Sequence, residues 1–282
     1  MSQSPTYQQE YIAPAALDWI NDQPFSRQYE DIYYTADGTD EVHRIYLKPS
    51  AMLERKDLSA CINVGELGFG SGLNFAITAT ELLQQTDKHL HFISFEAHPL
   101  DYEAWQKIAL TRTNLPIYKT LADNPPPLLT GWHRRSFANG RVQLSVYHGT
   151  ALEGLQDLTQ RQEQPVDAWF LDGFSPPKNP NMWDLKILSS VADNSTEGTT
   201  VCSFTSAGVV RRGLEALGFV MRKVDQQPIK RSSLAGTLVG NGAKQRQSTP
   251  KCVSVFGAGV AGCTVARHLA DQGVQVQIFD PN

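Results

Sequence analysis

The chain has 282 residues, of which 41% are apolar and 19% charged, and this composition excludes a disordered, collagenous or disulfide-scaffold protein. No apolar run approaches the ~20 residues that cross a bilayer, the N-terminus lacks the order of a signal peptide, and the four cysteines have no CxxC spacing. We therefore expect a cytoplasmic protein with no membrane segment and no metal site, although its net charge of −4 hides a basic stretch at residues 205–251.

Residues 1–59 are predicted to be an N-terminal extension that includes a hairpin. One or two helical turns are expected over residues 15–20. Farther along, residues 32–34 and 42–47 are rich in strand-forming side chains and flank Asp37-Gly38, a dipeptide typical of tight turns between strands. This pattern predicts a hairpin over residues 32–47.

Residues 60–240 alternate short apolar runs with segments of helical spacing, which predicts an α/β domain with a Rossmann-like, mostly parallel sheet. The expected strands are 61–67, 91–95, 142–147, 166–171, 199–204, 219–224 and 234–239. The expected helices are 73–83, 100–110, 183–191 and 208–217. The last two strands are joined too closely for a helix, so we expect an antiparallel edge. Prolines and glycines in residues 111–140 predict an irregular insertion over the mouth of the sheet.

A polar stretch at 241–251 is predicted to be a linker, followed at 252–282 by a truncated βαβ unit. Gly257, Gly259 and Gly262 follow an expected strand and open an expected helix, and Asp280 ends the next strand. This is the dinucleotide fingerprint, in which glycines admit a pyrophosphate and the acid holds ribose hydroxyls. Because a FAD or NAD domain needs further strands, we expect a vestigial FAD site that binds nothing here.

The earlier glycine motif has a different spacing, with Glu66 two residues before Gly68, Gly70 and Gly72. It resembles motif I of S-adenosylmethionine-dependent methyltransferases. That donor has no phosphate, so glycines would admit its ribose and methionine parts while a carboxylate meets its polar groups. Glu96 is then placed for the ribose diol and Gly149-Thr150 for the adenine edge. The alternative is a glycine-rich turn before a core helix.

Asp172 ends the fourth expected strand and precedes a loop stiffened by prolines. Amine methyltransferases have a similar Asp/Asn-x-x-Pro loop beside the methyl group, where a rigid loop can orient the nucleophilic nitrogen. We expect Asp172 to accept an N–H hydrogen bond and Phe174 to stack on a base. The alternatives are a turn residue for Asp172 and a core residue for Phe174.

Four segments, residues 63–75, 91–96, 166–183 and 204–218, together resemble the methyltransferase half of the MnmC family. The resemblance covers about residues 28–240, and residues 253–280 resemble the opening of the FAD-dependent half. It implies N-methylation, with S-adenosyl-L-methionine, of 5-aminomethyl-2-thiouridine at the tRNA wobble position to 5-methylaminomethyl-2-thiouridine. The FAD-dependent activity is expected to be absent, which makes a separate FAD-dependent oxidoreductase polypeptide a candidate partner. Thr150 departs from the acid expected near adenine.

The resemblance and the motifs give one set of site residues. Asp172 is the predicted catalytic residue. Cofactor-binding candidates are Glu66, Gly68, Gly70, Gly72, Asn74, Glu96, Gly149, Thr150 and Asp172. Substrate-binding candidates are Phe174, Pro176, Lys178, Asn179, Arg211, Arg212 and Arg231.

The basic run at residues 211–231 lies where the family would meet tRNA phosphates, although a solvated helix face and a basic linker would give the same charge. In the N-terminal part, the residues expected to help close the substrate pocket are Arg27, Asp31, Tyr33, Tyr34, Arg44 and Tyr46. For the three tyrosines, packing in the core is the alternative. The other functions open at this point are a FAD-dependent oxidoreductase fragment, a non-catalytic RNA-binding module and a methyltransferase of small-molecule amines.

Overall fold

The computed structural model describes residues 10–34, 38–161, 163–228, 232–240, 242–248 and 250–280. Its first elements are a small antiparallel sheet and a short helical stretch. The strands are β1 Leu17–Ile20, β2 Gln23–Ser26 and β3 Asp31–Ile32. The helices are α1 Gly38–Val42, η1 His43–Leu47 and α2 Lys48–Ser50.

Both secondary-structure predictions for this N-terminal part are wrong. Residues 17–20 alternate between half-buried and exposed, the period of a strand, and β1 turns into β2 through left-handed backbone at Asn21 and Asp22. The predicted second arm of the hairpin, residues 42–47, is helical, because Val42, Ile45 and Tyr46 recur at helical spacing and are all buried. Asp37, the first residue of the expected turn, lies outside the described residues.

The main sheet has eight strands in the described part of the chain, in the order β10-β11-β9-β8-β4-β5-β7-β6. Its strands are β4 Cys61–Leu67, β5 His89–Glu96, β6 Gly131–Phe137, β7 Val142–His148, β8 Val166–Leu171, β9 Ser195–Ser203, β10 Phe219–Asp225 and β11 Ser232–Leu238. The helices between them are α3 Leu73–Gln85, α4 Tyr102–Thr111, α5 Pro116–Asp123, η2 Ala138–Gly140, α6 Ala151–Gln160, η3 Pro180–Trp183, α7 Leu185–Asp193 and α8 Gly208–Ala216.

The Rossmann-like prediction is confirmed: β7, β5, β4, β8 and β9 are parallel, and β10 with β11 forms the expected antiparallel edge. The prediction of an irregular insertion at residues 111–140 is wrong, because this segment contains α5 and β6. Strand β6 pairs antiparallel with β7 along its whole length and makes the other edge. Its polar side chains, including Arg134 and Arg135, hide the strand pattern because an edge strand is only half covered.

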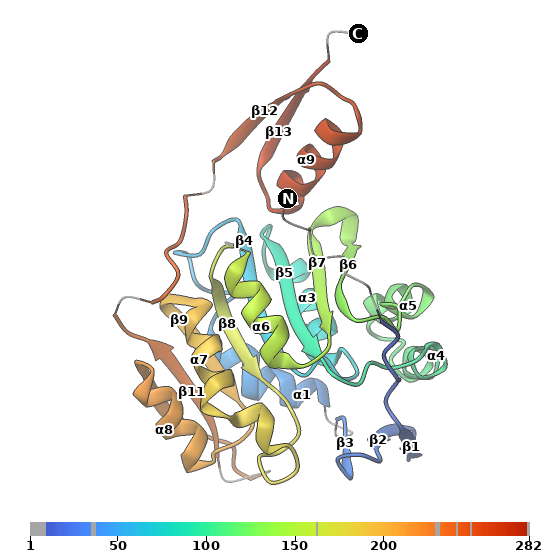
Figure 1. Cartoon of the computed structure of the whole chain (residues 1–282), viewed down its shortest axis with the longest axis vertical. Helices are drawn as coiled ribbons and strands as arrows, with labels where there is room; N and C mark the ends of the chain where they lie inside the picture. The colour runs from blue at the N-terminus through green and yellow to red at the C-terminus, as the bar shows by residue number, and fades with distance from the viewer. Residues whose placement is uncertain are drawn as a thin grey trace, which may run out of the picture.

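Helices cover both faces of this sheet (Figure 1). Neighbouring side chains of β8 show the two layers: Phe170 packs in the cluster with α3, whereas Trp169 packs in the cluster with α6 and α7. Every residue of β4 and β8 is buried, as expected for parallel strands covered on both faces. The sheet thereby brings the carboxyl ends of β4, β5 and β8 to one edge, where ligands bind in open α/β sheets.

The C-terminal βαβ unit, formed by β12 Cys252–Phe256, α9 Val260–Asp271 and β13 Gln275–Phe279, is present as predicted. It contacts the opposite edge of the main sheet, near the amino ends of its parallel strands (Figure 1). There the Asp271 carbonyl lies 3.2 Å from the His89 ring nitrogen, and Arg134 lies 3.3 Å from His268. In the described part of the chain, no helix is long and apolar enough to cross a membrane.

Residues 242–248, within the predicted linker, are hydrogen-bonded to that same edge. Arg246 pairs with Asp167, whose carboxylate is fully buried and also accepts from the Asn63 backbone N–H at 2.8 Å. The Lys244 side chain donates to the Leu158 carbonyl at 3.1 Å. Two basic side chains, Lys244 and Arg246, therefore attach residues 242–248 to the main domain.

We predict that Arg246→Ala lowers the free energy of unfolding by about 3 kcal/mol, because it leaves the buried Asp167 carboxylate without its cation. Urea denaturation at pH 7 measures the change. Arg211→Ala is the matched control, since it breaks a half-exposed pair with Glu215 on α8 and should cost less than about 1 kcal/mol. Equal effects of the two substitutions would contradict the structural role given to Arg246.

Candidate functional site

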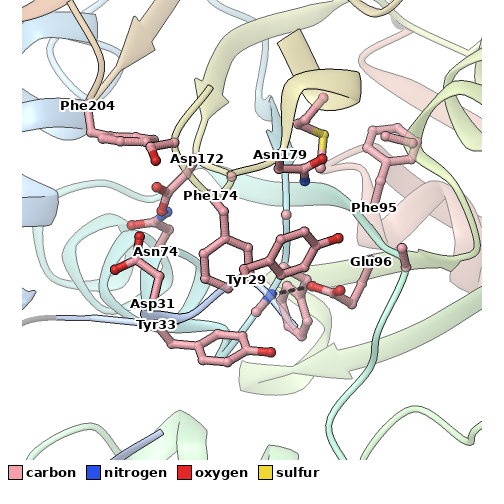
Figure 2. Close-up of a pocket in the computed structure, with 18 of the residues that line it drawn as sticks. Tyr29, Asp31, Tyr33, Asn74, Phe95, Glu96, Asp172, Phe174, Asn179 and Phe204 are labelled. Carbon is pink, nitrogen blue, oxygen red and sulfur yellow. Dashed lines mark hydrogen bonds between the residues drawn. The ribbon is translucent and has the colours of Figure 1, made fainter. Parts of the chain in front are cut away.

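A cavity of about 790 Å³ opens at the carboxyl edge of the sheet. Its walls come from the turn between β4 and α3, the end of β5, the loop after β8, and the N-terminal residues around β3 and α1 (Figure 2). Segments far apart in the sequence therefore meet in one pocket, of a size that takes a small molecule.

The glycine turn after β4 forms one wall of this cavity. Gly68 lies so close to β8 that a Cβ there would collide with the Asp172 carbonyl oxygen, and its φ of +90° also favours glycine. The next glycine, Gly70, donates its backbone N–H to Glu96 Oε2 at 2.7 Å, drawn as a dashed line in Figure 2. The turn thus puts glycine backbone, without a side chain, in the wall of the cavity.

Glu96 ends β5 with its carboxylate in the cavity. Each oxygen accepts one backbone N–H, Oε2 from Gly70 and Oε1 from His98 at 2.8 Å. Burial raises the pKa of Glu96, and these hydrogen bonds oppose that rise. Because each carboxylate oxygen has room for a second donor, Glu96 can still accept from a pair of hydroxyls.

Asp172, at the end of β8, is joined to Glu66 through Asn74. The Asn74 amide nitrogen donates to Asp172 Oδ2 at 2.6 Å and to Glu66 Oε1 at 2.9 Å. Burial raises the pKa of Glu66, and the nearby Asp172 charge raises it further. Burial raises the pKa of the Tyr46 hydroxyl, and the charge of Asp172 raises that pKa further.

An aromatic cluster closes the cavity from the N-terminal side. The rings of Tyr29 and Phe174 stack with centroids 4.3 Å apart, and Tyr33 meets Phe174 edge-on at 5.5 Å (Figure 2). Lys178 holds this N-terminal strap, residues 27–34, against the loop after β8: its ammonium donates to the Glu30 carbonyl at 2.7 Å and lies 3.2 Å from Asp31 Oδ2.

The cavity brings together many of the predicted site residues. Those that line it are Gly68, Gly70, Asn74, Glu96, Thr150, Asp172, Phe174 and Asn179. Those that do not are Glu66, Gly72, Gly149, Pro176, Lys178, Arg211 and Arg212. Arg231 lies outside the described residues.

Several predicted site residues have structural partners instead. Gly72 precedes the first residue of α3, and a Cβ there would press on Phe69 and Trp105. The side chain of Thr150 caps α6 in a reciprocal pair with Glu153, so only its position in the wall matches the prediction. Glu66 is 1% exposed.

The prediction missed Tyr29, His98, Met182 and Phe204, which line the cavity. Among these, only Tyr29 had a signal in the sequence, because tyrosines cluster near residue 30. Two roles were expected for Tyr33, Tyr34 and Tyr46, lining the pocket and packing in the core, and these side chains combine them. Tyr34 and Tyr46 are buried and also line the cavity.

The second glycine motif lies apart, in the βαβ unit. The backbone N–H of Ala258 donates to Asp280 Oδ2 at 3.0 Å, and a Cβ at Gly262 would collide with the Gly257 carbonyl oxygen. Phe256, beside this turn, is 81% exposed. The turn has the geometry of the fingerprint, but among the described residues nothing lies within 4 Å of a Cβ placed at Gly257 or Gly259. Among the described residues, no cluster of His, Cys, Asp and Glu could hold a metal ion.

Comparison with known proteins identifies the fold and the relatives of this chain. Residues 114–239 match the family described as S-adenosyl-L-methionine-dependent methyltransferase. The tRNA 5-methylaminomethyl-2-thiouridine biosynthesis bifunctional proteins MnmC of Nitrosospira multiformis and Stutzerimonas stutzeri are 36% and 37% identical over 94% and 96% of the chain. The chain spans 43% of the length of each.

Among solved structures, MNMC2 from Aquifex aeolicus has the same fold, with a TM-score of 0.63 and 24% sequence identity. The match covers 83% of this chain and 75% of that protein.

We predict that Lys178→Ala loosens the N-terminal strap, because it removes both the ion pair with Asp31 and the hydrogen bond to Glu30. Hydrogen exchange followed by mass spectrometry should show faster exchange in residues 27–34 and unchanged exchange in β4 and β8. Lys119→Ala, which breaks an exposed pair with Asp123 on α5, is the control. Unchanged protection of the strap in Lys178→Ala would contradict the assignment.

Proposed function

We propose, since the chain belongs to the MnmC family, that it methylates the 5-aminomethyl nitrogen of 2-thiouridine at the tRNA wobble position, with S-adenosyl-L-methionine as methyl donor. One observation carries the proposal. The glycine turn and Asp172 share a single cavity, with Gly68 pressed against the Asp172 backbone, so a donor on the turn has a carboxylate beside it.

The residues present fit the donor. The donor supplies an electrophilic methyl group when it is bound. Gly68 and Gly70 line the wall without side chains, which leaves room for its methionine and ribose parts, and Glu96 offers acceptor oxygens for the ribose hydroxyls. Thr150 and Leu152, at the start of α6, line the wall beyond Glu96, where the adenine would lie.

The cavity also suits an amine as nucleophile. Among the described residues, the acids Asp31, Glu41, Glu96, Asp172 and Asp184 line it together with the base Lys186. This excess of acids favours a cationic aminomethyl group over an anionic one. An amine attacks only through its neutral form. Asp172 would accept an N–H hydrogen bond from the amine at a carboxylate oxygen and take up the proton that the nitrogen releases on methylation.

Phe174 and Tyr29 would recognise the heterocycle that carries the amine. Their stacked rings lie in the cavity beside Asp172, and aromatic side chains commonly stack on an unpaired base. A wobble base is single-stranded in free tRNA, so it can enter such a pocket without the cost of opening a duplex.

The remaining expectations are part of the same proposal. We propose that the reaction takes place in the cytoplasm and that tRNA phosphates meet the basic side chains Arg211 and Arg212 on α8. We also propose that residues 252–280 do not hold FAD by themselves, because the fingerprint turn has exposed surroundings. A separate FAD-dependent oxidoreductase polypeptide stays a candidate partner.

The test of the function is methyl transfer by the purified chain. We expect the label of methyl-labelled S-adenosyl-L-methionine to appear in 5-methylaminomethyl-2-thiouridine when the acceptor is tRNA that carries the aminomethyl nucleoside. Nucleoside mass spectrometry identifies the product. The same tRNA without the aminomethyl group is the control. Label found only in small amines, or nowhere, would rule the proposal out.

For the catalytic role of Asp172, we predict that Asp172→Asn lowers kcat by ~10²-fold, the scale of a lost general base. Affinity for S-adenosylhomocysteine, measured by calorimetry, should change by less than about threefold, because the substitution keeps the size of the side chain. Asp193→Asn, exposed at the end of α7, is the matched control. Normal turnover by Asp172→Asn would refute the assignment.

A further inference from the structure

Glu66 is the acid of the first glycine motif, yet it does not reach the cavity. It is 1% exposed, and both carboxylate oxygens have partners within the fold: Oε1 accepts from Asn74 at 2.9 Å and Oε2 accepts from Ser94 at 2.7 Å. A side chain in this state contributes no surface to a methyl donor. Its position in the motif must therefore have another use.

Asn74, which lines the cavity, connects Glu66 to it. An amide nitrogen carries two hydrogens, and here one is donated to Glu66 Oε1 and the other to Asp172 Oδ2 at 2.6 Å. Figure 2 shows the Asn74 and Asp172 side chains next to each other at one side of the pocket. Because Ser94 fixes Glu66, Glu66 in turn fixes the orientation of the Asn74 amide. The second amide hydrogen is therefore directed at Asp172 Oδ2.

We propose that Glu66 and Asn74 are positioning residues for Asp172: Glu66 fixes the Asn74 amide, and Asn74 fixes one oxygen of the Asp172 carboxylate so that the other is directed at the amine. The inference rests on the proposed function. Glu66 is then not a residue that binds the methyl donor. It acts on Asp172, the acid beside the substrate, through two consecutive hydrogen bonds.

The chemistry favours an amide over a cation in this place. A lysine or arginine beside Asp172 would neutralise it and lower its proton affinity, whereas a neutral donor fixes the carboxylate and leaves its charge. The role of Glu66 is then that of an acceptor, for which a glutamine oxygen can substitute.

The experiment separates positioning from donor binding. Asn74→Ala and Glu66→Ala should each lower kcat by ~10²-fold at saturating donor, the scale expected when a reacting group is misplaced by about 1 Å. The Kd for S-adenosylhomocysteine should stay within about threefold. Glu66→Gln should recover most of the lost kcat, since its side-chain oxygen still accepts from Asn74. Thr80→Ala, on the far part of α3, controls for changes in that helix.

Two results of this experiment would overturn the inference. A Kd weakened more than tenfold with kcat unchanged would make Asn74 or Glu66 a donor-binding residue. A Glu66→Gln variant as impaired as Glu66→Ala would mean that charge is required. If an alanine variant does not fold, Asn74→Asp, which keeps the shape but loses both donated hydrogens, takes its place and should lower kcat as much.

A crystal structure of Asn74→Asp gives a readout that does not depend on turnover. The Asp172 carboxylate should rotate away from residue 74, and an unchanged orientation would refute the positioning role. If the wild-type chain transfers no methyl group but Asp172 does rotate in the variant, then the proposed function has failed and the positioning contact has not.

Discussion

The carboxyl ends of β4 and β8 approach so closely that no side chain fits at Gly68. The parallel register sets this contact, because Glu66 pairs with Phe170 and Leu67 with Leu171, which puts Gly68 beside Asp172. The glycine turn and the acid are therefore not independent features that happen to be near each other. One residue of slip between these strands would send Asp172 to the other face of the sheet and separate the acid from the turn.

Acids buried at the two edges of this sheet are stabilised in different ways. At the amino edge, Asp167 pairs with Arg246, so its charge is compensated within the fold. At the carboxyl edge, Glu66 accepts from a hydroxyl and an amide, and Glu96 accepts from backbone N–H groups. Neutral donors fix the geometry of a carboxyl group without placing a positive charge beside it. The difference is consistent with the proposed recognition of hydroxyls and an amine.

The sequence was sufficient for features that are local along the chain. The apolar runs of β4 and β8, the glycine turn and Asp172 could all be predicted, because parallel strands and tight turns leave strong local patterns. The strap could not, since Lys178 meets Glu30 across 148 positions and nothing near either residue indicates the contact. The positioning role proposed for Glu66 could not be predicted either, because it depends on the orientation of a side chain. Strand β6 was missed because the polar side chains on its exposed face interrupt the apolar pattern of a strand.

The two glycine turns show why a motif alone does not make a site. Both leave backbone exposed at the start of a helix, and both have an acid at the end of the next strand. The first is enclosed: Tyr33 lies against Gly70, and the strap and the loop after β8 complete the wall. Around the second, the positions of Gly257 and Gly259 are open, and Phe256 faces solvent. Because water weakens hydrogen bonds to a ligand, the enclosing segments, and not the glycines alone, distinguish the first turn from the second in the described part of the chain.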